Sequence, residues 1–296
     1  MNGGPVDGGR ALFLRACELD VAVRKPGNVS LASPGHGMQA EMFIRSARAA
    51  AEPLFLPGSR VGARIEAAQA ASWRAAGCNT NLGILLLCAP IAAAVEHCSL
   101  PISVAALRGA LESVLSELDV VDASAAYRAI AAAHPGGLGS APSQDVRDAP
   151  SVGLRAAMAL AAQRDSIARQ YRDGFAELFE LALPALGAGF SPGEAGEPAG
   201  PAATHAIQRL YLTLLASLPD SHIVRKHGEP VAHIVMSAAQ AWRVRADDGM
   251  RLDADAGFAA WDAQLKARGL NPGTTADLTV AALMLAGLTA AATPPA

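Results

Sequence analysis

Apolar residues recur along most of the chain at intervals of three and four, which is the spacing of one face of an amphipathic helix. The pattern is clearest at 167–179 and 207–218, and a weaker one covers 12–23. Runs of alternating Val, Ile and Thr, which would predict strands, are not found. We therefore predict an all-α fold of roughly ten to twelve helices, the others at about 38–52, 60–76, 80–97, 103–117, 121–133, 153–163, 230–246, 255–268 and 274–291.

The segment 167–179 also carries charged residues at intervals of four. Asp165, Arg169 and Asp173 follow this spacing. Opposite charges four residues apart are neighbours on a helix surface, so we expect these side chains to form ion pairs on the outer side of the helix.

Glycine and proline clusters interrupt the helical pattern at about 134–150 and 187–201. Neither cluster separates regions of different composition, and no internal repeat is found. Residues 1–296 are therefore predicted to form a single helical domain crossed by two long loops. Such loops often serve as active-site lids, but solvated connections would also be consistent with the sequence.

Composition and charge exclude several classes of protein. Hydrophobic residues make up 51% and charged residues 17%, which excludes a largely disordered chain. The net charge of −3 argues against a nucleic-acid partner. The apolar stretches 82–95 and 278–292 are shorter than the roughly 20 residues that span a bilayer. With no signal peptide and four cysteines that lack zinc-site spacing, a cytoplasmic location away from membranes is predicted.

Polar residues gather in four segments between the apolar helices, and two of these segments lie directly before a predicted helix. Helix N-termini favour anions, so a central polar cavity lined by these segments would suit a polyphosphate ligand. The same residue types are also ordinary helix caps, and both interpretations remain open. The candidate binding residues are Lys25, Asn28, Asn79, Thr80, Asn81, Arg225, Asn271, Gly273, Thr274 and Thr275.

Three carboxylates and two histidines are the candidates for chemistry. Glu66 lies in an apolar-looking helix, and with Asp220 and Asp277 it could hold Mg²⁺, which binds carboxylates together with substrate phosphates. Alternatively, Asp220 could cap a helix, and Asp277 could simply interact favourably with the dipole of the last helix, in whose first turn it lies. His36 and His222 lie in expected loops, where each could act as a general base, bind phosphate or serve no catalytic role.

Several common catalytic motifs are missing from the sequence. There is no P-loop, no Rossmann G-x-G-x-x-G after a strand, no G-x-S-x-G nucleophile elbow and no H-E-x-x-H. Any nucleotide would therefore be bound by a different arrangement.

The polar segments, in their order along the chain, resemble the triphosphoribosyl-dephospho-CoA synthase family over residues 8–290. The early matches are K-P-G at 25–27, His36, Met38 and F-x-x-S-A at 43–47. The middle matches are Gly62, Glu66, Gly77, Asn79, Thr80 and Gly83. The late matches are Asp220, Ser221, Ile223, Arg225, Gly228 and N-P-G-T-T-A-D-L at 271–278.

The chain departs from the citrate-lyase type of this family at two places. Gly37 stands where an acidic residue precedes the Met, and Asn28-Val29-Ser30 follows K-P-G in place of a segment with a carboxylate. The segments 134–139 and 164–171 resemble a divergent branch, the synthase-like proteins of tetrahydromethanopterin gene sets. The resemblance therefore leaves the acceptor open.

The resemblance implies an enzyme that moves the 5-triphosphoribosyl group of ATP to a hydroxyl of dephospho-CoA or a related cofactor precursor and releases adenine. We hypothesise that Lys25, Arg225 and the segments 79–81 and 273–275 anchor the triphosphate in this reaction. Glu66, Asp220 and Asp277 would hold Mg²⁺ or stabilise a ribose cation. His36 or His222 would take the proton of the hydroxyl.

Two other functions remain open at this point. One is phosphoribosyl transfer from phosphoribosyl pyrophosphate to a tetrahydromethanopterin-type precursor. The other is a non-catalytic helical ligand-binding protein that has kept the shape of the site. The sequence also leaves open whether the chain forms a homo-oligomer.

Overall fold

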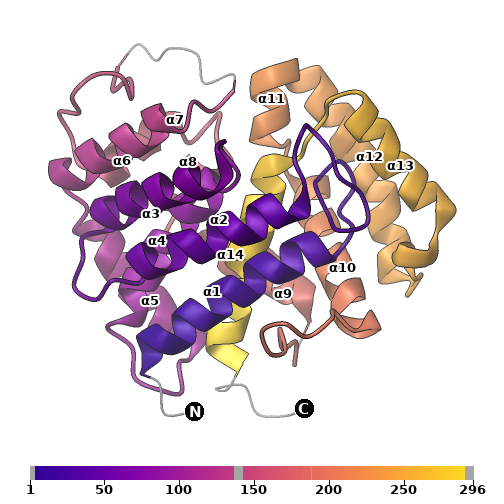
Figure 1. Ribbon diagram of the computed structural model, residues 1–296, viewed down its shortest axis with the longest axis horizontal. Helices are drawn as coiled ribbons and strands as arrows, with labels where there is room; N and C mark the ends of the chain where they lie inside the picture. Colours follow the sequence, from indigo (N-terminus) through magenta and orange to yellow (C-terminus); the bar gives the residue numbers. More distant parts are fainter. Residues whose placement is uncertain (1–3, 137–142, 188, 291–296) are drawn as a thin grey trace.

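The computed structural model describes residues 4–136, 143–187 and 189–290, which form fourteen α-helices (Figure 1). No strand occurs in these ranges; two isolated bridges lie between residues 30 and 38. The predicted all-α fold is confirmed, with more helices than expected. The helices are α1 (Pro5–Ala22), α2 (Ala40–Leu54), α3 (Val61–Ala76), α4 (Leu82–Val95), α5 (Val104–Ser116), α6 (Val120–Ala132), α7 (Leu154–Ala161), α8 (Ser166–Arg172), α9 (Leu183–Leu186), α10 (Pro201–Ser217), α11 (Ser221–His227), α12 (Glu229–Asp247), α13 (Ala256–Ala267) and α14 (Gly273–Thr289), with a π-helix (Leu178–Ala182) and a 3₁₀-helix (Leu252–Ala254).

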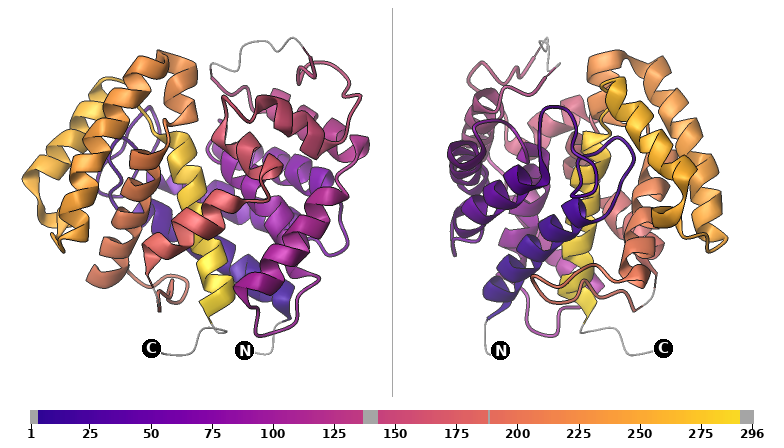
Figure 2. Two further views of the ribbon diagram at one scale, coloured as in Figure 1. Left: turned by 180° about the vertical axis from the view of Figure 1, so that it is seen from behind. Right: turned by 45° about the vertical axis from the view of Figure 1, so that its right-hand side comes forward.

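Helices α4 and α14 form the centre of the larger hydrophobic core. Nearly every residue of each helix is buried, which explains why their sequences are apolar on all sides. Figures 1 and 2 show α14 passing through the middle of the molecule, and it contacts α1, α4 and α10. None of the described helices is both long and apolar enough to cross a membrane.

A second, smaller core lies among helices α10 to α13. It is built around Tyr211 and Phe258, and the rings of Trp242 and Trp261 stack beside it with centroids 6.2 Å apart. The views in Figure 2 place α11, α12 and α13 on one side of α14 and helices α3 to α7 on the other. The space between these two sides contains the candidate site.

The helix predicted at 167–179 is wrong in one respect, because α8 ends at Arg172. Gly174 and Phe175 both adopt left-handed backbone conformations, with φ of 62° and 60°, and these cannot continue a right-handed helix. The buried ring of Phe175 packs against Tyr171 with centroids 5.8 Å apart. The apolar spacing therefore identified the buried side chains correctly but not the break in the backbone.

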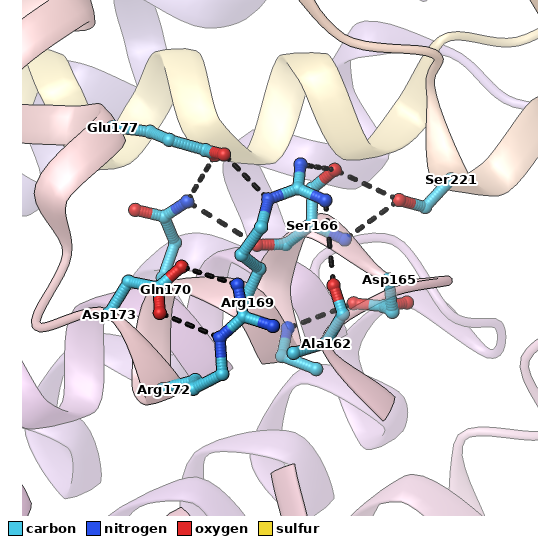
Figure 3. A network of polar contacts seen from close by, with 10 residues as sticks. Ala162, Asp165, Ser166, Arg169, Gln170, Arg172, Asp173, Glu177 and Ser221 are labelled. Atoms are coloured by element: carbon cyan, nitrogen blue, oxygen red, sulfur yellow. Dashed lines mark hydrogen bonds and ion pairs between the residues drawn. The ribbon is translucent and has the colours of Figure 1, made fainter. Parts of the chain in front are cut away.

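The ion pairs expected within that segment are also wrong. Arg169 pairs with Glu177 at 2.6 Å, and Asp173 pairs with the adjacent Arg172 (Figure 3). Asp165 instead caps α8 by accepting a hydrogen bond from the N–H of Ala168. Because Asp165 occupies the cap, it does not lie on the outer face of a longer helix.

The two predicted loops are only partly described. Residues 137–142 of the first loop and residue 188 of the second lie outside the described ranges. The described part of the second loop lies against α1, where the buried guanidinium of Arg15 donates hydrogen bonds to the carbonyls of Pro192 and Glu197.

Candidate active site

A cavity of about 660 Å³ lies where the predicted polar segments meet. Its lining comes from the segment after α1, the start of α4, helices α6 to α8, α11 and the start of α14. The expected convergence of the segments is therefore present. The predicted residues that line the cavity are Asn28, His36, Asn79, Thr80, His222, Arg225, Asn271, Gly273, Thr274 and Asp277.

Asp277 differs from the other acids in the described cavity lining, Asp20, Asp145 and Asp165, each of which forms an ion pair. Among the described residues, its carboxylate has neither a hydrogen bond nor an ion pair, and it lies directly against the backbone of Gly83 in α4. Burial raises the pKa of Asp277 well above its ordinary value, and repulsion from Asp20 and Asp220 raises it further. An acid held in this way is a candidate for chemistry or for binding a cation.

Asp220 has the opposite environment, although the sequence suggested the same role for it. One carboxylate oxygen accepts hydrogen bonds from the N–H groups of His222 and Ile223, and so caps α11. The other accepts hydrogen bonds from the N–H and the hydroxyl of Thr275, and so caps α14. Neither Asp220 nor Thr275 lines the cavity. The capping interpretation of Asp220 is correct, and Thr275 is engaged by protein rather than available to phosphate.

Lys25 is not available as an anchor for phosphate. Its ammonium is completely buried, lies 3.1 Å from the carboxylate of Asp20 and donates a hydrogen bond to the side-chain oxygen of Asn28. Asp20, which the sequence did not single out, lines the cavity in its place. Burial raises the pKa of Asp20, while the ion pair with Lys25 acts to lower it.

Both candidate histidines line the cavity, and each is oriented by a backbone carbonyl. The Nδ1 of His222 lies 3.1 Å from the carbonyl oxygen of Asn271, and the Nε2 of His36 lies 2.8 Å from that of Gly27. A carbonyl only accepts hydrogen bonds, so the contacting nitrogen of each ring carries the proton and the other is left as an acceptor. Burial and the nearby cations lower the pKa of His222 to about 4.

The segment before α4 is held by one local hydrogen bond and by hydrogen bonds with serines of α2 and α3. The side chain of Asn79 accepts a hydrogen bond from the N–H of Leu82, and the hydroxyl of Thr80 donates to Ser46. Asn81 is buried away from the cavity and accepts a hydrogen bond from Ser72. Asn79 and Thr80 therefore reach the cavity, whereas Asn81 supports the start of the helix.

Glu66 is not part of this site. It lies on α3 outside the cavity lining, where its carboxylate accepts two hydrogen bonds from the guanidinium of Arg128, at 2.6 and 2.7 Å. The proposed metal site of Glu66, Asp220 and Asp277 is therefore not formed. Within the described ranges, no group of three or more His, Cys, Asp or Glu side chains is arranged to hold a metal ion.

Five charged residues in the cavity lining were missed by the sequence reasoning: Asp20, Asp145, Arg164, Asp165 and Lys226. Asp165 pairs with Arg225 at 2.6 Å, which links α8 to α11. Close by, the N–H of Ser166 donates to the hydroxyl of Ser221 (Figure 3). An Asp directly before Ser166 is a cap signal that the sequence could have revealed. The cavity-facing cations carry no such signal.

Unusual backbone conformations are concentrated at the cavity. Four residues other than glycine have a left-handed backbone in the described ranges, and three of them, His36, His134 and Gln144, line the cavity. Such conformations cost free energy and tend to occur where side chains are held for function. Their location supports the cavity as the functional site.

Comparisons with known proteins identify the fold and the family of the chain. The crystal structure of a protein from Archaeoglobus fulgidus, provisionally assigned as a triphosphoribosyl-dephospho-CoA synthase, superimposes with a TM-score of 0.62 and 22% sequence identity, covering 83% of this chain and 98% of that chain. This likeness shows a shared fold. No curated protein matches the chain. The family described as ATP:dephospho-CoA triphosphoribosyl transferase matches residues 9–294, nearly the whole chain. The chain therefore belongs to this transferase family.

Proposed function

We propose that this chain transfers the 5-triphosphoribosyl group of ATP to a hydroxyl of a small-molecule acceptor and releases adenine. The observation that carries the proposal is the placement of two groups in one cavity: Asp277, an acid with no partner among the described residues, and His222, an oriented neutral imidazole. The ring of His222 lies against Gly273, four residues before Asp277 in α14. Positions four apart share one helix face, so the two groups lie along the same wall.

The reaction is a substitution at the anomeric carbon of the ribose. The bond from this carbon to the adenine nitrogen breaks, and its electron pair leaves with adenine. The acceptor oxygen forms the new bond to the same carbon, and its proton is balanced by the proton that adenine takes up. Positive charge develops on the ribose ring between these events, and a carboxylate beside the ring stabilises it. Asp277 supplies that carboxylate.

His222 is the better placed of the two histidines to take the proton. Its Nδ1 hydrogen is held by the carbonyl of Asn271, which leaves Nε2 as the acceptor. With a pKa of about 4, the ring is neutral at pH 7 and able to accept a proton. A bound triphosphate would raise this pKa towards neutrality, because a nearby anion favours the protonated ring.

Magnesium fits this cavity with fewer protein ligands than the sequence suggested. Mg²⁺ commonly binds through one or two carboxylates together with substrate phosphates. Asp277 has no partner among the described residues, and Asp20 lies near enough to raise its pKa. When bound with ATP, Mg²⁺ would neutralise part of the triphosphate charge. Arg225 lines the same region and is the cation best placed to contact the triphosphate directly.

Release of adenine tests the proposal. The chain is incubated with Mg-ATP and with dephospho-CoA, which is the acceptor in the family description. The products are then separated, and their masses are measured by mass spectrometry. We expect free adenine together with an acceptor heavier by one triphosphoribosyl group. A parallel incubation with phosphoribosyl pyrophosphate distinguishes the other donor. Binding of Mg-ATP without adenine release, across a panel of hydroxyl acceptors, would overturn the proposal in favour of a binding protein.

A further inference from the structure

One wall of the cavity lies outside the motifs that carry the family resemblance. This wall comes from α6, α7 and the segment 143–146, and it includes the apolar side chains Ile130, Met158 and Leu160. The motif residues Asn79, Arg225 and Asp277 line other parts of the cavity. We call the part of the cavity that these motif residues line the motif side. If the motif side holds the donor, the wall formed by α6, α7 and 143–146 is available to the acceptor.

Two cations in the cavity lining have no side-chain partner among the described residues. Arg164 lies in the turn between α7 and α8, and Lys226 lies in α11. Both are exposed, and neither side chain makes a hydrogen bond or an ion pair with any residue in the described ranges. Arg225 differs from them, because its guanidinium is paired with Asp165.

The position of Lys226 relates these cations to the reacting group. Lys226 follows His222 by four residues in α11, and both line the cavity. Side chains four residues apart share a helix face and lie about one turn, or roughly 5–6 Å, from each other. A molecule that presents a hydroxyl to His222 therefore places a group a few bonds away beside Lys226.

We propose that Arg164 and Lys226 form an anion subsite for a phosphate or diphosphate group of the acceptor. A guanidinium matches phosphate oxygens with two parallel hydrogen bonds, and an ammonium adds a point charge. The acceptor would then be a phosphorylated compound whose reacting hydroxyl lies a few bonds from the phosphate and whose apolar part packs against α6 and α7. This inference rests on the proposed function, because that function assigns the donor to the motif side.

The experiment uses the full chain and inorganic pyrophosphate as the probe. Calorimetry measures pyrophosphate binding while saturating Mg-ATP occupies the donor side, and measures Mg-ATP binding separately. The test variant is R164Q/K226Q. The matched control is R74Q/R268Q, which removes two exposed cations that lie outside the cavity lining and have no side-chain partner in the described part of the chain. Thermal melting confirms that both variants are folded.

We expect pyrophosphate affinity to fall about tenfold or more in R164Q/K226Q, while Mg-ATP affinity changes less than twofold and the control behaves as wild type. With dephospho-CoA as acceptor, the same variant should raise the KM for dephospho-CoA and leave kcat nearly unchanged. Equal pyrophosphate binding by variant and wild type would overturn the subsite. Weakened Mg-ATP binding would overturn it as well, by assigning the cations to the donor. Failure of the proposed function is a different result from failure of the subsite, because in that case the wild type itself would release no adenine.

Discussion

Replacing Gly83 by alanine tests whether the position of Asp277 controls turnover. Gly83 is in the first turn of α4, and a Cβ atom there would lie 2.0 Å from the Oδ2 of Asp277 and 2.8 Å from the Cδ1 of Ile167. Ordinary contact begins near 3.4 Å, so the carboxylate must move by about 1.4 Å, the difference between 3.4 and 2.0 Å. No charge is removed, so a loss of turnover with unchanged Mg-ATP affinity reports the position of the carboxylate rather than obstruction of the cavity that Gly83 lines.

The magnitude follows from the geometry. A misplacement of about 1 Å at a reacting centre can reduce the rate about a hundredfold, so we expect kcat to fall by at least that factor. Overpacking costs roughly 1–3 kcal/mol, and alanine in a helix recovers roughly 0.5–1 kcal/mol, which leaves a net loss of stability of about 0–2.5 kcal/mol. The variant should therefore fold and bind Mg-ATP but turn over slowly.

The assay measures adenine release at saturating Mg-ATP, together with urea unfolding of the same samples. Gly109→Ala is the matched control, because Gly109 is within α5 and no atom lies within 4 Å of its added Cβ. We expect this control to gain roughly 0.5–1 kcal/mol of stability and keep its turnover. A folded Gly83→Ala variant with wild-type kcat would refute the role of Asp277.

Three further substitutions separate the acids. Asp277→Asn should abolish turnover and raise the melting temperature relative to wild type. The pKa of Asp277 is higher in the folded state, so the wild type loses stability as pH rises above the unfolded pKa of about 3.9 and through the folded pKa. Melting scans from pH 3.5 to 8 should therefore show the melting temperature of the variant exceeding that of wild type by an amount that grows with pH. A difference that stays constant with pH contradicts this. Glu66→Gln should leave adenine release unchanged and alter stability by less than about 1 kcal/mol, since its ion pair is exposed; lost turnover would return Glu66 to the site. Asp220→Ala should cost roughly 2–4 kcal/mol in urea unfolding through two lost caps, and unchanged stability would reject the capping role.

Helix positions could be predicted closely from the sequence because burial and turn signals agree there. Residues 60–76 were expected to be helical, and α3 spans Val61–Ala76, ending where Gly77 adopts a left-handed backbone. Around 167–179 the two signals disagree. Phe175 has the apolar spacing of a helix and is fully buried, but its backbone is left-handed. Periodicity reports which side chains are buried, and it does not report whether the backbone between them is continuous.

The site was predictable as a set of segments but not as a set of side-chain roles. Glu66 looked buried because alanines surround it, yet small neighbours leave room for Arg128 to reach it from α6. Lys25 looked like a free cation, but Asp20, five residues earlier in α1, buries it in an ion pair. These partnerships depend on how helices pack, which local sequence does not specify.

Asp220 and Asp277 show how packing gives different roles to two acids that the sequence placed alike, each near a helix start. Asp220 accepts four hydrogen bonds and joins α11 to α14, so its charge is compensated where it lies. Asp277 accepts none from the described residues, and its pKa is raised by burial and by Asp20 and Asp220. An ionised carboxylate that is partly removed from water and has no partner destabilises the fold. Retaining Asp277 is therefore explained by a partner that arrives with the substrate, either a cation or a developing positive charge on the ribose.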